Sequence, residues 1–343
     1  MIGVGIIGLG FIGRNHFNQY EKLKDRVRIA AVCDKEPDRL AGDWSKVGGN
    51  VGDKQGSVRD LTGIKQYPNW KDLVADPQVQ MVDICVPTYL HAEMATAALQ
   101  AGKHVLSEKP MALAVADCDK MLKAAAKARG KFMIAQCIRF WPECVYLQQS
   151  IKDKRFGQLR ALHLRRQAST PDYSLNNWIV NPKLSGGAIL DLHVHDVDFM
   201  LFMLGKPKSI CAQSYKRTGG GYDRVHALWH YKKELVVQLE GAWDMPPAFG
   251  FNMGFTARFE KAAIVFDLTS GKPLTVMHNG GSAETPQMPT ATDGYFNEID
   301  YFLGCIEKNQ KPKISTPAES RLAVALALAE VKSAQTGKPV AIQ

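Results

Sequence analysis

Short apolar runs alternate with longer segments of helical periodicity over the first 137 of the 343 residues. This alternation predicts an α/β arrangement, a parallel sheet with helices on both faces. Gly102 and Gly130 follow two of the predicted helices and are typical stop signals. The predicted strands are 2–7, 27–33, 63–67, 81–86, 104–106 and 131–137, and the predicted helices include 70–75, 90–101 and 114–129.

The pattern changes at about residue 138, so we expect a first domain over 1–137 and a second over 138–343. Short charged turns, Lys232–Glu234 and Glu260–Lys261, each join two strand-like runs and predict antiparallel hairpins. One face of the run 225–231 is partly aromatic, and we expect another subunit to cover it. The predicted strands are 159–167, 210–216, 225–231, 235–243, 255–259 and 263–268, and the predicted helices are 143–154, 188–204 and 319–335.

One segment, Asp43–Gly63, interrupts this rhythm because several glycines lie among its polar residues. It is interpreted as a surface loop. Since it follows the second predicted strand, we expect it near the adenosine end of any nucleotide that the first domain binds.

Composition narrows the class of protein. The formal charge of +9 would favour an anionic ligand, but Lys and Arg are scattered, which indicates a solvated surface and argues against nucleic acid as a partner. The seven cysteines form no CxxC pair, which fits a reducing cytoplasm. With no apolar run of about 18 residues, no membrane span is expected.

The most informative motif follows the first predicted strand. Gly8, Gly10 and Gly13 form a GxGxxG turn around Leu9, Phe11 and Ile12, and the second strand ends on Asp34. Glycines at these spacings allow a tight turn, close approach of a pyrophosphate and close helix packing, while the acid accepts hydrogen bonds from a ribose. We therefore predict a Rossmann domain that binds a nicotinamide dinucleotide. Asp34 favours NAD, although Lys35 and Arg39 leave NADP possible.

Two further clusters carry candidate chemistry. Glu108-Lys109-Pro110 ends the fifth predicted strand, where ligands of open α/β sheets bind, and the proline restricts the lysine or forms a cis bond. On the predicted helix 188–204, Asp191 and His195 are four residues apart and share one face. A carboxylate in this position can orient the imidazole, which then serves as a proton acceptor near neutral pH. The simpler interpretations are that Lys109 is a solvated loop lysine and that His195 is a structural histidine bonded to Asp191. Shared metal ligation by His193 and His195 is disfavoured because they point to different helix faces, and no metal is predicted.

Taken together, these motifs make the chain resemble the glucose–fructose oxidoreductase/inositol dehydrogenase (Gfo/Idh/MocA) family over nearly its whole length. The resemblance implies a Rossmann domain followed by an α+β domain with an open, mostly antiparallel sheet, through which the protein would form homodimers or homotetramers. It also implies that Lys109, Asp191 and His195 are the catalytic residues. The positions that carry it are Gly8, Gly10, Gly13, Asp34, Pro87, Thr88, His91, Glu108, Lys109, Pro110, Trp178, Gly186, Gly187, Asp191, His195 and Asp198.

Cofactor contacts are expected from the glycine turn with Phe11 and Ile12, from Asp34, and from the two loops after the fourth and fifth strands. The loop residues are Pro87, Thr88, His91, Glu108 and Lys109. His16 and His91 resemble helix positions near the cofactor that have a structural role. Weaker candidates for substrate contacts are Arg139, Tyr173 and Trp178.

The hypothesis is hydride transfer between NAD and a secondary hydroxyl of a sugar or cyclitol, with His195 taking the proton and Lys109 stabilising the alkoxide. Two alternatives stay open. One is a dihydrodiol or imine reductase on the same scaffold. The other is an enzyme that holds NAD tightly as a transient hydride carrier during glycoside cleavage or epimerisation. A catalytically silent nucleotide sensor is disfavoured because all three catalytic positions are filled.

Overall fold

The computed structural model describes residues 1–49, 56–216, 221–231 and 234–343, and it divides into two compact units. The first unit comprises Met1–Cys137, Asp172–Trp178 and Tyr295–Arg321. The second comprises Ile138–Pro171, Ile179–Gly294 and Leu322–Gln343. The first unit therefore contains residues from both sides of the expected boundary, whereas all of the second unit lies after it.

A six-stranded parallel sheet forms the centre of the first unit, in the order β3-β2-β1-β4-β5-β6. The order reverses beside β1, as in a doubly wound Rossmann sheet, so that part of the sequence prediction is confirmed. The strands are β1 (Ile2–Ile7), β2 (Val27–Cys33), β3 (Lys65–Tyr67), β4 (Met81–Ile84), β5 (His104–Glu108) and β6 (Phe132–Ala135).

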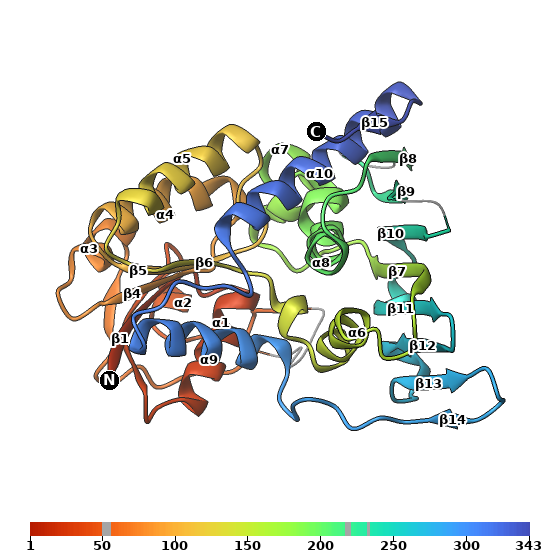
Figure 1. Ribbon diagram of the computed structural model, residues 1–343. Coiled ribbons are helices and arrows are strands. Elements are labelled where there is room, and N and C mark those ends of the chain that lie inside the picture. The colour runs from red at the N-terminus through yellow and green to blue at the C-terminus, as the bar shows by residue number, and fades with distance from the viewer. Residues whose placement is uncertain (50–55, 217–220, 232–233) are drawn as a thin grey trace. The chain divides into compact units, whose positions relative to one another are not determined.

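Helices lie on both faces of this sheet, with α3, α4 and α5 on one face and α1 and α9 on the other (Figure 1). The α-helices are α1 (Phe11–Lys22), α2 (Pro37–Leu40), α3 (Trp70–Ala75), α4 (His91–Gln100), α5 (Val115–Lys127) and α9 (Gly294–Glu307), and a short 3-10 turn, η1 (Thr88–Leu90), precedes α4. The sequence analysis missed α9. Its apolar residues, Phe296, Ile299, Phe302, Leu303 and Ile306, recur at helical spacing, which is the signal that would have revealed it.

The described ends of Asp43–Gly63 form no helix or strand, as expected for a loop, but they are also anchored in the core by a few apolar side chains. Trp44 is fully buried, and its ring meets that of Phe17 edge-on at 4.9 Å. Val47 and Leu61 are buried in the same core. These apolar side chains hold both ends of the segment against α1, whereas Gly52 and the rest of 50–55 lie outside the described residues.

The second unit is built on a nine-stranded sheet in the order β14-β13-β12-β11-β7-β10-β9-β8-β15. Only β7 and β10 pair in parallel among the described neighbours, which confirms an open, mostly antiparallel sheet. The strands are β7 (Leu159–Ser169), β8 (Ser209–Tyr215), β9 (Arg224–His230), β10 (Val236–Met245), β11 (Phe251–Phe259), β12 (Ala262–Asp267), β13 (Thr275–His278), β14 (Ala283–Glu284) and β15 (Val340–Ala341).

The two predicted hairpins are confirmed, since β9 pairs with β10 and β11 with β12 in antiparallel fashion. Of the first hairpin's turn, Lys232 and Lys233 lie outside the described residues. The remaining helical segments are η2 (Cys137–Phe140), α6 (Pro142–Lys152), η3 (Leu175–Val180), α7 (Pro182–Ser185), η4 (Ile189–His193), α8 (Val194–Leu204), η5 (Pro247–Phe249), η6 (Leu268–Ser270) and α10 (Pro317–Thr336).

Candidate functional site

The glycine turn between β1 and α1 has the shape that a dinucleotide phosphate requires. Gly10 precedes α1 without any side-chain cap on the helix, so backbone N–H groups of the first turn point outward. A Cβ at Gly10 would meet Arg39 Nη1 at 3.8 Å as its nearest described neighbour. A Cβ at Gly13, in contrast, would lie 1.8 Å from the carbonyl oxygen of Gly8. The turn is thus closed toward the protein and open at Gly10, where a pyrophosphate would bind.

Asp34 is held rigidly at the end of β2. Its carboxylate accepts the backbone N–H of Leu9 at 2.7 Å and that of Glu36 at 2.9 Å. The side chain is buried except for a small exposed fraction. These bonds tie the acid to the glycine turn, so one rigid segment presents both the phosphate-binding and the ribose-binding groups. Phe11 and Ile12 are partly exposed at the start of α1.

Lys109 follows β5 in a segment that its neighbours fix on both sides. The Lys109–Pro110 peptide is cis, one of the two forms that the sequence analysis considered. The Glu108 carboxylate accepts the Lys109 N–H at 3.1 Å. Glu108 and Pro110 are buried, whereas Lys109 is partly exposed. Lys109 therefore lies directly after the carboxyl end of β5, the strand that pairs with β4, and its loop neighbours the loop after β4.

His91 connects those two loops. Its ring is buried, with Nδ1 2.8 Å from the Pro110 carbonyl oxygen and Nε2 2.8 Å from that of Val86. Burial lowers the pKa of His91, so the neutral ring donates to one carbonyl at a time. Thr88 is buried and Pro87 partly exposed. His91 thus connects the two loops through their backbone carbonyl oxygens, and its ring is buried.

Tyr173 and Trp178 belong to the first unit, although the sequence analysis placed them in the second domain. Tyr173 packs edge-on against Phe11, with the ring centroids 6.0 Å apart. Trp178 is partly exposed in η3. The aromatic ring of Tyr173 therefore lies beside the start of α1, close to the phosphate-binding turn.

In the second unit, the segment that carries Asp191 and His195 is not one continuous α-helix, and this corrects the prediction. Gly186 and Gly187 adopt left-handed backbone, with φ of 82° and 71°. A π-helical turn, η4, follows before α8 begins at Val194. The wider π turn changes which residues share a face, and such turns recur at functional sites. Asp191 and His195 are partly exposed, whereas residues 192–194 between them are buried.

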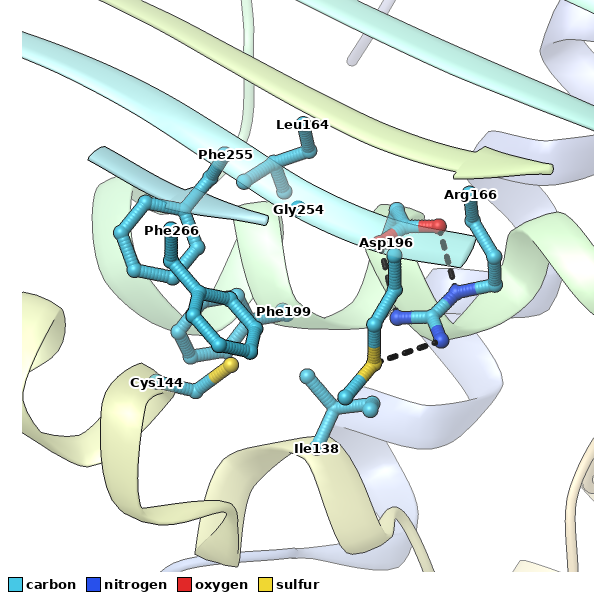
Figure 2. A pocket seen from close by; sticks show the side chains of 10 residues that line it. Ile138, Cys144, Leu164, Arg166, Asp196, Phe199, Gly254, Phe255 and Phe266 are labelled. Atoms are coloured by element: carbon cyan, nitrogen blue, oxygen red, sulfur yellow. Dashed lines mark hydrogen bonds and ion pairs between the residues drawn. The ribbon is translucent and has the colours of Figure 1, made fainter. Parts of the chain in front are cut away.

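Asp196, the next acid on α8, serves the fold. Arg166 of β7 donates to both of its carboxylate oxygens, at 2.8 and 3.0 Å. Figure 2 shows this pair on the wall of a small pocket whose other lining residues are mostly apolar and aromatic. The two charged side chains in this wall are bonded to each other, and the other lining residues are mostly apolar. We therefore interpret the pocket as a packing gap between α8 and the sheet.

Asp198 also forms an ion pair within the unit. Arg139 donates to both of its oxygens at 2.7 Å, and both side chains are buried. The guanidinium also lies over the ring of Phe202, 4.6 Å from its centroid. Arg139 therefore anchors α8, which is a structural role that the sequence analysis did not foresee when it named the residue as a substrate contact.

His193 is buried beneath the π turn. Its Nε2 lies 3.0 Å from Glu330 of α10, and Trp229 Nε1 donates to the other oxygen of that carboxylate at 2.8 Å. Burial alone would lower the pKa of His193, but the charge of Glu330 raises it above its ordinary value. A protonated imidazole fits this pairing better than a shared metal site with His195.

A second buried cluster in the first unit was missed by the sequence analysis. His16 and Tyr20 of α1 meet Asp83 of β4, with both bonds to the aspartate at 2.8 Å. Glu108 and Glu298 approach the same imidazole. Only the folded chain brings these residues together, because they are up to 282 positions apart (298 minus 16). The spacing of one histidine carries no signal for such a cluster.

Comparison with known proteins identifies the family. Residues 2–136 match the family described as "Oxidoreductase family, NAD-binding Rossmann fold", and residues 144–265 match the "GFO/IDH/MocA C-terminal domain". The chain belongs to the Gfo/Idh/MocA oxidoreductase family. This confirms the resemblance seen in the sequence and the expectation of NAD as the cofactor.

Two curated relatives of this Gfo/Idh/MocA chain cover it almost completely, and a third covers about four fifths of it. Myo-inositol 2-dehydrogenase of Thermotoga maritima is 23% identical over 99% of this chain and 98% of its own length. Inositol 2-dehydrogenase of Rhizobium meliloti is 27% identical, with 98% of each chain covered. 1,5-Anhydro-D-fructose reductase of Ensifer adhaerens is 28% identical over 81% of this chain and 84% of its own.

Among solved structures, a levoglucosan dehydrogenase in complex with NADH and levoglucosan superimposes with a TM-score of 0.85. It is 19% identical and covers 99% of both chains, so this likeness establishes the fold alone. None of the described helices is long and apolar enough to cross a membrane.

Proposed function

We propose that this NAD-dependent oxidoreductase acts on a secondary hydroxyl, or the corresponding ketone, of a sugar, a cyclitol or a sugar derivative. The observation that carries the proposal is the placement of Lys109 directly after the carboxyl end of β5. The residue is partly exposed, its two neighbours are buried, and its backbone N–H is bonded to Glu108. The relatives named above as inositol and anhydro-sugar enzymes support the substrate class.

Each proposed catalytic residue has one task. His195 accepts the hydroxyl proton, which contributes on the order of 10²–10⁴-fold to the rate. Lys109 donates a hydrogen bond to the same oxygen and stabilises the developing alkoxide. Asp191 orients the imidazole or bonds a neighbouring hydroxyl. NAD, when bound, supplies the acceptor for the hydride.

The cofactor groups divide by location. Gly10 and Gly13 with the first turn of α1 would hold the pyrophosphate, and Asp34 the adenosine ribose. Asp34 repels a 2′-phosphate, which supports NAD as the main cofactor, while Arg39 beside Gly10 keeps use of NADP open to test. Tyr173 and Trp178 remain proposed contacts of the ligands, and Arg139 does not.

The decisive experiment measures NADH formation across inositols, aldoses, anhydro-sugars and sugar acids, for the native enzyme and for Lys109→Ala. We expect Lys109→Ala to lower kcat by at least about 100-fold, because alkoxide stabilisation is lost, and to leave the Kd for NAD within about threefold. Lys120→Ala is the matched control, since that lysine is exposed on α5 of the same unit.

Native turnover in Lys109→Ala would refute the assignment. If NAD instead stays bound through purification and no substrate releases NADH, the transient hydride-carrier chemistry would replace the dehydrogenase proposal. Activity confined to imines or dihydrodiols would replace the substrate class.

We further infer that the protein assembles as a homodimer or homotetramer through the nine-stranded sheet. The expectation that another subunit covers the partly aromatic face of 225–231 is wrong, because Trp229 is buried within the chain and donates to Glu330 of α10. Other apolar residues on the sheet's strands are exposed instead: Leu228, Val236 and Met277 have exposed fractions of 46%, 61% and 47%. Light scattering on the native protein and on Leu228→Glu tests this, and the variant is expected to have the lower mass.

A reducing cytoplasm is the proposed location, supported by seven described cysteines of which none forms a disulfide.

A further inference from the structure

A buried charged cluster lies beneath the segment that carries Lys109. His16 comes from α1, Asp83 from β4, Glu108 from β5 and Glu298 from α9. The side chains of His16, Asp83 and Glu298 have no exposed surface, and only 7% of the Glu108 side chain is exposed. Three carboxylates and one imidazole in such a place require an explanation, because burying charge is costly unless each charge is paired.

The imidazole of His16 lies between the carboxylates. Nδ1 is 2.8 Å from Asp83 Oδ2, and Nε2 is 3.3 Å from Glu108 Oε1. The Nδ1 contact is a hydrogen bond, whereas the Nε2 contact with Glu108 has no hydrogen-bond geometry and is an ionic contact. Because a carboxylate lies beside each ring nitrogen, an imidazolium suits this place better than a neutral ring. Burial by itself would lower the pKa of His16, but the negative charge of Asp83 and its hydrogen bond raise the pKa well above the ordinary value.

The Glu108 carboxylate contacts both His16 and the backbone of Lys109. Its Oε1 faces His16, and its Oε2 accepts the backbone N–H of Lys109 at 3.1 Å. On the other side of the lysine, His91 Nδ1 lies 2.8 Å from the Pro110 carbonyl oxygen. The backbone of Lys109 is therefore held at both ends, and the hold at its amino side depends on the orientation of one carboxylate.

We propose that His16, as a buried imidazolium, is a positioning residue for Lys109 and acts through Glu108. The proposal rests on the proposed function insofar as Lys109 is catalytic. His16 orients Glu108, Glu108 fixes the backbone at Lys109, and the amine of Lys109 then projects in one direction toward the substrate oxygen. A displacement of about 1 Å at such an amine lowers the rate on the order of 100-fold.

A purely structural cluster would not need this chemistry. Well-packed apolar residues of similar volume stabilise a core as well as, or better than, buried ion pairs. A directional imidazolium instead gives the Glu108 carboxylate one orientation. Tyr20 and Tyr295 complete the surroundings, with the hydroxyl of Tyr20 on Asp83 and the ring of Tyr295 centred 6.3 Å from that of His16.

The test compares His16→Gln with Tyr20→Phe, its matched control. Glutamine keeps a donor near Glu108 but carries no charge. Tyr20→Phe instead removes a hydrogen bond to Asp83 Oδ2, the oxygen bonded to His16 Nδ1, and leaves the contact between His16 Nε2 and Glu108 in place. We expect His16→Gln to lower kcat by about 10- to 100-fold, with KM and the Kd for NAD within about threefold. Tyr20→Phe should keep kcat within about twofold.

A second readout does not depend on turnover. Acetylation of individual lysines, followed by mass spectrometry, reports how accessible and mobile each amine is. In His16→Gln, the labelling rate of Lys109 relative to that of Lys120 should rise at least threefold. It should stay unchanged in Tyr20→Phe. This measurement separates the two proposals, because it holds even if Lys109→Ala shows that the lysine is not catalytic.

Glu108→Gln and the double variant His16→Gln/Glu108→Gln complete a double-mutant cycle with His16→Gln. If both residues act along one chain of contacts, His16→Gln/Glu108→Gln should lose no more kcat than the worse single variant. Multiplied losses, or native kcat and labelling in His16→Gln, would overturn the proposal. If His16→Gln does not fold, Glu108→Gln alone must show the faster labelling of Lys109. One equivalent of a divalent cation in the native protein, absent from His16→Gln, would also overturn it, since a metal would then be the central charge.

Discussion

Gly10 and Gly13 lie in the same turn and have different physical tasks. The backbone of Gly10 has φ of −74°, which any residue adopts, and open space lies beside it. Gly13 packs on the carbonyl oxygen of Gly8, with no room for a side chain. The second glycine is therefore required by the packing of α1 on β1, whereas the first is not required by packing and is the one proposed to contact the cofactor.

This difference predicts opposite effects of two identical substitutions. Gly10→Ala should leave the free energy of unfolding within about 0.5 kcal/mol and weaken NAD binding at least tenfold, because its methyl group lies in the path of the pyrophosphate. Gly13→Ala should destabilise the fold by about 1–3 kcal/mol or more through overpacking. Urea unfolding and calorimetric titration with NAD measure both effects. Equal loss of stability in the two variants would contradict this division.

Single residues also show which parts of the structure could be predicted from the sequence. The βαβ unit around the glycine turn was predicted correctly because such a turn is local, whereas the cofactor contacts of the glycines and Asp34 stay a prediction. The partners of His16 and Arg139 were not predictable, because each is bonded to residues that are more than 55 positions away in the chain (Asp83 and Asp198). Their roles depend on contacts that only the tertiary fold creates.

At the scale of elements, His193, the last residue of the π turn, connects this turn to the sheet and to α10. A Cβ on Gly241 of β10 would lie 2.5 Å from His193 Nδ1, so the strand leaves room for this ring. Glu330 of α10 then pairs with the ring at 3.0 Å. Strand, π turn and helix are thus joined at one buried ion pair.

Because the pKa of His193 is raised in the folded protein, its pairing stabilises the fold fully below the unfolded pKa of about 6.5. That stability is lost as the pH rises through the folded pKa. His193→Gln should therefore cost about 3–5 kcal/mol at pH 6 and less at pH 9. Thermal unfolding across this range measures the difference. His278→Gln, which breaks a mostly exposed pair with Glu284, is the control and should change little at any pH.

Periodicity predicted most strands and helices because local pattern determines them, and it failed where packing decides. The segment 188–204 has the period of one helix, and nothing in its pattern reveals the π turn. The segment after Asp43 is polar and rich in glycine, yet Trp44 anchors it in the core. In both places a single buried side chain overrides the local pattern.

At the scale of the whole molecule, the Rossmann unit is not a continuous stretch of chain. Tyr295–Arg321 belongs to the same compact unit as residues 1–137. Ile299, Phe302 and Leu303 of α9 have no exposed surface and lie in the same core cluster as Phe17 of α1. The amino-terminal sequence alone therefore lacks part of its own core.

A fragment of residues 1–137 should consequently be unstable. Burial of the three α9 side chains contributes on the order of 5–9 kcal/mol, comparable with the entire free energy of unfolding of a typical domain. We expect the fragment to bind an apolar dye and to unfold without cooperativity. Joining 295–321 to it through a flexible linker should restore a cooperative transition and NAD binding, whereas the same fusion with Phe302→Asp should not. Cooperative unfolding of the bare fragment would show that α9 is dispensable to the Rossmann core.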